Sequence, residues 1–163
     1  MSYIYCNKNP LSKNVEDCVI RAIATVLDED WDNVFLGLTI EAYMYKDLIN
    51  SNIVWGSYLL YLGFERYSLP NTCPLCYTVK DFTIDHPIGR FVLGDGAHAI
   101  AVIDGNYYDA FDSGDRTVLF YYERREINGN TESILHTTDQ PILSTVSEST
   151  SAAKTRTTKS SIC

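Results

Sequence analysis

The stretch from Cys18 to Leu27 is apolar around nearly its whole helical circumference, with Arg21 and Thr25 as its only polar positions. A helix without a polar face is typical of the centre of a fold, where neighbouring elements cover it on all sides. The chain has 163 residues, of which 45% are hydrophobic, and this is enough to build a core around such a helix. We therefore expect Cys18–Leu27 to form the buried central helix of a globular domain.

Further helices are expected to follow this one, and strands are expected after Gly89. Asp30 is suited to cap a helix that runs from Trp31 to Leu38. The other expected helices are 41–49, 54–62 ended by Gly63, and a short one that opens with the capping-box spacing of residues 78–81 and ends before Pro87. The expected strands are 90–93, 98–103, 107–111 and 117–122. This order predicts an α+β fold in which N-terminal helices pack on a C-terminal antiparallel sheet.

Composition changes sharply near residue 127. Ser and Thr make up 15 of the 37 residues from 127 to 163, and this segment contains no Phe, Tyr or Trp. Such a segment cannot bury enough apolar surface to offset the entropy lost on ordering. We therefore expect a folded domain at 1–126 and a disordered Ser/Thr-rich tail at 127–163.

Charge and composition exclude several classes of protein. The 13 basic and 21 acidic residues give a net charge of −8, which disfavours binding to nucleic-acid backbones. No apolar run is long enough to span a membrane, and the first residues do not resemble a secretory signal. Because no secretory signal is found, we expect a cytoplasmic protein whose five cysteines are reduced thiols. We expect neither a nucleic-acid nor a membrane partner.

Cys18 stands where the buried helix is expected to begin. The positive end of a helix dipole favours the thiolate, which is the reactive form of cysteine. Glu16 and Asp17 would oppose thiolate formation unless their side chains point away. The alternative is an inert buried cysteine, because free cysteines are among the most buried residues. A reactive Cys18 therefore requires a base nearby.

His98 is the only histidine in an expected strand. Its neighbours are small or β-branched, which favours a strand inside the sheet, and alternation puts His98 on the face of Ile100 and Val102. A buried imidazole needs a polar partner. In the alternative interpretation, His98 is a core residue that bonds a carbonyl group.

The hairpin after this strand determines which carboxylate lies near His98. If residues 104–106 form a three-residue loop, His98 lies directly opposite Asp112. If the loop has two residues, His98 faces Phe111 and Asp109 lies diagonally across. We expect the first register and Asp112 as the partner, with Asp109 as the second choice. A thiol at a helix start together with a His–carboxylate pair is typical of an activated nucleophile.

Three segments resemble papain-like cysteine peptidases: 14–23 around Cys18, 97–105 around His98 and 108–113 around Asp112. Over about residues 3–125 the chain is similar to small bacteriophage and prophage proteins related to bacteriocin-processing peptidases. The resemblance implies a papain-like fold, with Cys18 as nucleophile, His98 as base and Asp112 as orienting residue. It also implies a location in the host cytoplasm, or association with the virion, if the protein is phage-encoded.

The resemblance implies hydrolysis of a peptide or isopeptide bond in a peptide or protein substrate, through a thioester intermediate and without a metal ion or organic cofactor. The papain-like pattern has an oxyanion-binding Gln five or six residues before the cysteine, where this chain has Lys13 and Ser12. We expect Asn14, the nearest amide side chain, and the Cys18 backbone N–H to replace it. The alternatives are a catalytically inactive binding or virion-associated relative, and an amidase or deconjugating enzyme.

The Cys73–Cys76 pair and Arg21 are interpreted as structural. Cys73 and Cys76 have the spacing of half a zinc site, but within 1–126 Cys6 and His86 are the only unassigned residues that could complete it. Structural thiols are therefore preferred over a regulatory disulfide or a metal site. Arg21, one turn after Cys18, is expected to pair with an acidic residue, and a role beside the thiolate is the less favoured option.

Overall fold

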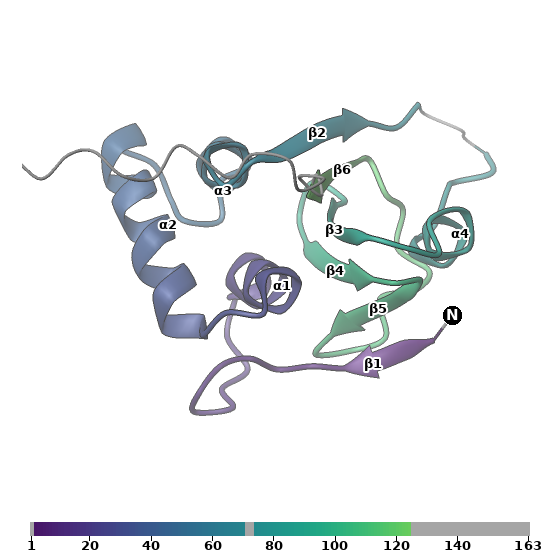
Figure 1. Cartoon of the computed structure of the whole chain (residues 1–163), viewed down its shortest axis with the longest axis horizontal. Helices are drawn as coiled ribbons and strands as arrows, with labels where there is room; N and C mark the ends of the chain where they lie inside the picture. The colour runs from purple at the N-terminus through teal and green to yellow at the C-terminus, as the bar shows by residue number, and fades with distance from the viewer. Residues whose placement is uncertain (1, 71–73, 125–163) are drawn as a thin grey trace, which may run out of the picture. The chain divides into compact units, whose positions relative to one another are not determined.

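The computed structural model describes residues 2–70 and 74–124 (Figure 1). This part of the chain has an α+β fold with four helices and a six-stranded mixed sheet. The helices are α1 Cys18–Leu27, α2 Trp31–Tyr45, α3 Asn52–Tyr61 and α4 Val79–Asp85. The strands are β1 Tyr3–Tyr5, β2 Phe64–Ser68, β3 Arg90–Gly94, β4 Ala99–Ile103, β5 Asn106–Asp109 and β6 Phe120–Arg124. The predicted tail at 127–163 lies outside the described residues, and so does Cys73.

The strands follow the order β1-β5-β4-β3-β6-β2, which makes β4 an inner strand as predicted. All neighbouring pairs are antiparallel except β1 and β5, which run parallel. The prediction of a purely antiparallel sheet is therefore wrong at one edge. Both edge strands were missed, because β1 has only three residues and the polar, largely exposed β2 lacks a hydrophobic alternation.

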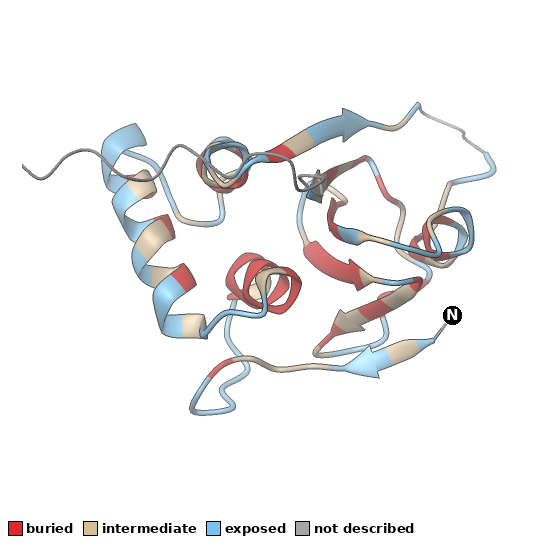
Figure 2. Cartoon of the chain, in the orientation of Figure 1, coloured by how far each residue is buried: buried red, intermediate tan, exposed pale blue. Residues whose placement is uncertain are grey.

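Helix α1 has the predicted bounds and the predicted central position. Its residues from Val19 to Val26 are all buried, as Figure 2 shows. One face of the sheet packs against α1 and α3, α2 packs on these two helices, and α4 covers the other face of the sheet (Figure 1). The two small residues Ala99 and Ala101 belong to the core on the α1 side. They allow the helix to lie close to the middle of the sheet.

The remaining helices agree in part with the sequence. Residues 31–45 form one helix, so the predicted separate helix at 41–49 is wrong. Lys46, which follows α2, has the left-handed φ of 56° typical of a helix end. Gly63 follows α3 with a φ of 83°, as expected of a residue that stops a helix. The capping box of Thr78 and Asp81 at the start of α4 is confirmed.

The hairpin between β4 and β5 differs from the preferred prediction. Asp104 and Gly105 have φ angles of 47° and 71°, which is typical of a two-residue type I′ turn. Ile103 therefore pairs with Asn106, and the predicted three-residue loop is wrong. The last strand is also shifted, since β6 begins at Phe120 and not at residue 117.

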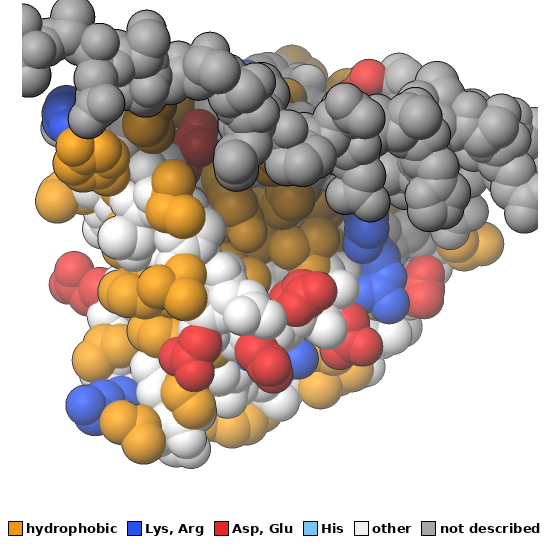
Figure 3. Space-filling model, turned by 60° about the vertical axis from the view of Figure 1, so that its left-hand side comes forward, with side chains coloured by type: hydrophobic (Ala, Val, Ile, Leu, Met, Phe, Trp, Pro, Cys, Tyr) orange, Lys and Arg blue, Asp and Glu red, His pale blue; other side chains and the backbone are white. Residues whose placement is uncertain are grey.

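The surface around α2 combines apolar and acidic side chains. Figure 3, which brings this side of the molecule forward, shows both kinds close together and a hollow lined by hydrophobic side chains. The large exposed apolar residues of α2 are Leu36, Ile40, Tyr43, Met44 and Tyr45. Within the described residues, no helix combines the length and hydrophobicity needed to cross a membrane.

Candidate active site

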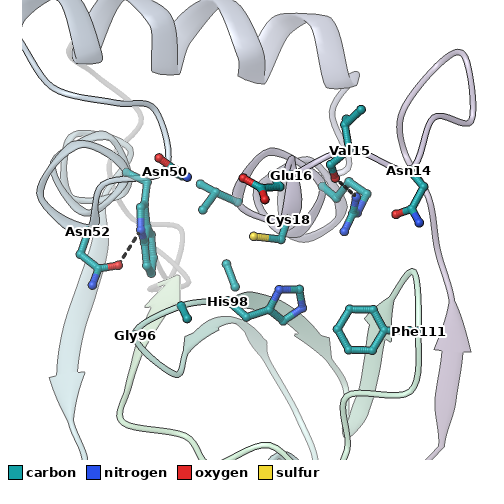
Figure 4. A pocket seen from close by; sticks show the side chains of 14 residues that line it. Asn14, Val15, Glu16, Cys18, Asn50, Asn52, Gly96, His98 and Phe111 are labelled. Carbon is teal, nitrogen blue, oxygen red and sulfur yellow. Dashed lines mark hydrogen bonds between the residues drawn. The ribbon is translucent and has the colours of Figure 1, made fainter.

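Cys18 is the first residue of α1 and lies in the wall of a cleft of about 450 Å³ (Figure 4). His98 lines the same cleft, and Figure 4 shows its ring next to the Cys18 side chain. At the first position of a helix the backbone N–H has no acceptor within the helix. Among the described residues no other acceptor is found for the N–H of Cys18. This donor is therefore available to a ligand in the cleft.

A turn immediately before β4 positions His98. The Asp95 carboxylate accepts hydrogen bonds from the backbone N–H groups of Ala97 at 2.9 Å and His98 at 2.6 Å. The same carboxylate forms an ion pair with Arg116. His98 thus precedes the regular strand, and the alternation that sends Ile100 and Val102 toward α4 does not extend to it. The predicted strand start at His98 is wrong by one residue, and this difference lets the ring reach the cleft.

His98 pairs with Asp109 and not with Asp112. Its Nε2 atom lies 2.6 Å from Oδ2 of Asp109, whose side chain is 3% exposed. The two-residue turn places His98 opposite Phe111 and leaves Asp109 diagonally across, which is the register that the sequence ranked second. The prediction that Asp112 orients the imidazole is therefore wrong. The Asp104-Gly105 dipeptide, typical of type I′ turns, was the signal for this register.

Asp112 forms hydrogen bonds with Tyr107 and Gly114 and not with His98. Its Oδ1 accepts a hydrogen bond of 2.6 Å from the Tyr107 hydroxyl and one of 3.0 Å from the Gly114 backbone N–H. These bonds stabilise the turn after β5. Asp112 is exposed and does not line the cleft that holds Cys18.

The surroundings of Cys18 favour the thiolate. Burial raises the pKa of the thiol, but this effect is outweighed by hydrogen bonds with the His98 side chain and the Ala99 backbone, and by the positive charges of His98 and Arg21. The pKa of Cys18 is therefore lower than that of an ordinary cysteine. The thiolate is the form that attacks carbonyl carbons.

The pKa of His98 shifts in the opposite direction. Burial lowers the pKa of the imidazole, but hydrogen bonds and charge interactions with Asp109 and Cys18 outweigh it and raise the pKa to about 9. The pKa values of Cys18 and His98 thus shift in opposite directions, which favours a thiolate–imidazolium pair near neutral pH. Because Nε2 is bonded to Asp109, the Nδ1 side of the ring remains for the sulfur atom.

Buried ion pairs of Arg21 lie next to the Cys18–His98 pair. Arg21 forms an ion pair with Asp17, one turn earlier, and its Nη2 lies 3.9 Å from Oδ1 of Asp109. Asp17 also accepts hydrogen bonds of 3.1 Å from Asn9 Nδ2 and 3.0 Å from Trp31 Nε1. The predicted acidic partner of Arg21 is therefore confirmed. With these three donors, the Asp17 charge that could have opposed the thiolate is compensated.

Three amide side chains line the cleft on both sides of Cys18: Asn14 on one side, Asn50 and Asn52 on the other (Figure 4). Asn14, the predicted donor, lines the cleft, but Figure 4 shows it beyond Val15. The sulfur of Cys18 points the other way, toward the side of Asn50 and Asn52 (Figure 4). Asn50 was not predicted, because it lies between α2 and α3 and no spacing in the sequence relates it to Cys18.

The other cysteines and the other histidine of the described residues lie apart from this site. Cys6 contacts the hydroxyl of Thr25 at 3.5 Å, and the ring of His86 stacks on Phe82 with 3.9 Å between the ring centroids. Cys76 is exposed. Within residues 2–70 and 74–124 no group of three or more His, Cys, Asp or Glu side chains could hold a metal ion.

Comparisons of this chain with models of protein families, with curated proteins and with solved structures found no match.

Proposed function

We propose that this chain is a cysteine peptidase of the papain-like type that hydrolyses a peptide or isopeptide bond. The observation that carries the proposal is the shared cleft of Cys18 and His98, with His98 held by Asp109 at 2.6 Å. A nucleophile at a helix start, a base beside it and a carboxylate that orients the base are the three components of such a site.

In the proposed reaction, the Cys18 thiolate attacks the carbonyl carbon of the substrate amide. The carbonyl oxygen, on which negative charge develops, accepts hydrogen bonds from the Cys18 backbone N–H and from a side-chain amide in the cleft. The imidazolium of His98 protonates the leaving amine, and the C–N bond breaks to leave a thioester on Cys18. His98 then deprotonates a water molecule that hydrolyses the thioester, which releases the carboxylic acid and regenerates the thiol.

Asp109 holds the ring of His98 throughout this cycle. A carboxylate at Nε2 keeps Nδ1 directed at the sulfur and stabilises the imidazolium that exists before each amine departs. Arg21 contacts the other oxygen of Asp109 and restricts its rotation. Apart from the substrate and the water molecule, the proposed reaction uses side chains and backbone groups of the described residues.

The experiment is a search for the acyl-enzyme. The protein is incubated with a library of peptides, quenched with acid and digested, and the Cys18 peptide is examined by mass spectrometry. A thioester on Cys18 that hydroxylamine removes, together with peptide cleavage that Cys18→Ala abolishes, supports the proposal. Peptides that bind without acylating Cys18 would instead indicate the alternative, a catalytically inactive binding protein.

A further inference from the structure

A second cleft, of about 440 Å³, lies beside the one that contains Cys18. It is bounded by the N-terminal half of α1, by α2 and by the loop between α2 and α3. Four residues line both clefts, namely Val15, Glu16, Val19 and Asn50. One of them, Val19, directly follows Cys18. A ligand chain in the first cleft therefore passes the entrance of the second within a short distance of the sulfur atom.

The interior of this second cleft is apolar. Its base consists of the buried side chains of Val19 and Ile20. One wall is formed by Trp31 and Phe35, whose rings stack with 4.9 Å between their centroids and an interplanar angle of 9°. Leu48, which is 71% exposed, lies at the edge. An apolar side chain placed here would exchange water for contact with two aromatic rings and aliphatic groups.

Apart from the Asn50 amide, which the two clefts share, the polar side chains in this cleft are already engaged or negatively charged. The indole N–H of Trp31 donates to Asp17, so the ring offers only apolar surface to a ligand. Asp17 is satisfied by Arg21, Asn9 and Trp31. Glu16 contributes a negative charge where the two clefts join, which disfavours an acidic ligand group.

We propose that the second cleft is the specificity pocket of the enzyme and binds a large apolar side chain of the substrate, aromatic or branched aliphatic. The proposal rests on the proposed peptidase function. Because residues in an extended chain advance about 3.3 Å each, the selected side chain belongs to a residue within about two positions of the cleaved bond. Trp31 and Phe35 are the residues that determine this specificity.

Alkylation of Cys18 by a series of iodoacetamides tests the pocket without a known substrate. In each reaction the thiolate forms a C–S bond, the C–I bond breaks and iodide leaves. The reagents carry N-methyl, N-(2-phenylethyl) or N-(2-carboxyethyl) groups, and glutathione in parallel reactions corrects for their intrinsic reactivity. Mass spectrometry of the Cys18 peptide gives the rates. The ratio of the phenylethyl rate to the methyl rate is measured for Cys18 and for glutathione, and a higher ratio for Cys18 indicates that the pocket binds the phenyl group.

For the unmodified protein we expect this ratio to exceed that for glutathione by about tenfold or more, because the pocket removes a phenyl ring from water. We also expect the carboxyethyl reagent to react with Cys18 more slowly than the methyl reagent does. Phe35→Ala and Leu48→Glu lower the ratio to within about threefold of that for glutathione. Leu48→Glu changes an exposed position and therefore keeps the test decisive even if Phe35→Ala does not fold. The matched control is Leu36→Ala, an exposed α2 residue outside the pocket, which leaves the ratio unchanged.

A ratio for the unmodified protein equal to that for glutathione would overturn the proposal, and so would a high ratio that both pocket variants retain. The peptidase proposal is judged separately, from the rate with the methyl reagent. A methyl rate at Cys18 no faster than that of glutathione at the same pH contradicts an activated thiolate, whatever the ratio.

Discussion

The Nε2 atom of His98 lies 2.6 Å from Oδ2 of Asp109. His98 immediately precedes β4 and Asp109 ends β5, and the two-residue turn at Asp104 and Gly105 places them diagonally across the hairpin. This diagonal relationship leaves Nδ1 of the ring for Cys18. It also makes the identity of the carboxylate testable, since Asp112 lies only three positions further along the chain.

Replacement of Asp109 is expected to reduce activity far more than replacement of Asp112. Asp109→Ala removes the acceptor that orients His98, and we expect kcat/KM to fall by about 10²–10⁴, the range that a positioned base contributes. Asp109→Asn keeps an acceptor oxygen for the ring and should recover part of this loss. Asp112→Ala, which loses only the bonds to Tyr107 and Gly114, should change kcat/KM less than tenfold. Equal losses in the two alanine variants would contradict the assignment.

The titration of His98 provides a second prediction. Nuclear magnetic resonance of its ring should give a pKa raised to about 9, because Asp109 and Cys18 both favour the charged imidazole. Cys18→Ser removes one of these causes and should lower the pKa of His98. The stabilising effect of protonated His98 on the folded state is complete below its unfolded pKa of 6.5 and is lost as pH rises through about 9. A His98 pKa in the protein at or below 6.5 would contradict the pairing.

Arg21 is expected to be essential for stability because it pairs with two buried carboxylates. Arg21→Met leaves Asp17 and Asp109 buried without this partner, and we expect the free energy of unfolding to fall by about 3–5 kcal/mol. Urea denaturation measures this change. The matched control is Lys80→Met, which removes an exposed ion pair with Asp115 and should change stability little. Similar unfolding midpoints for the two variants would show that the buried network contributes no more than a surface pair.

The oxyanion donor can be identified by comparing two asparagines. The Cys18 side chain points toward the side of Asn50 (Figure 4), so Asn50→Ala should lower kcat by about 10²–10³, the usual cost of one lost donor. Asn14→Ala should have a smaller effect, although Asn14 is the donor that the sequence favours. Steady-state kinetics of both variants on one cleaved peptide measure the difference. A larger loss of kcat in Asn14→Ala than in Asn50→Ala would contradict this assignment and identify Asn14 as the donor.

Features determined by local pattern were predictable from the sequence. The bounds of α1 follow from its continuous apolar stretch, and the start of α4 follows from the Thr78–Asp81 capping box. Cys18 at a helix start and His98 at an inner strand were found for the same reason. In each case the signal lies within about ten consecutive residues.

Features determined by tertiary packing were not predictable in the same way. The three residues of β1 become a strand only through parallel pairing with β5, more than 100 positions away. The choice between Asp109 and Asp112 depended on a single residue of loop length. Asn50 reaches the cleft because of how α2 and α3 pack, and no local pattern records this.

The pH dependence of Cys18 alkylation by iodoacetamide is the most direct test of the thiolate–imidazole pair. We expect the alkylation rate of Cys18 in the unmodified protein to reach its plateau at a lower pH than that of an ordinary thiol, because the effects of His98, Ala99 and Arg21 outweigh burial and lower the pKa of Cys18. In His98→Ala the rate should instead rise with pH toward the pKa of an ordinary thiol, 9.0. Identical pH profiles for the two proteins, both with the midpoint of an ordinary cysteine, would contradict the account.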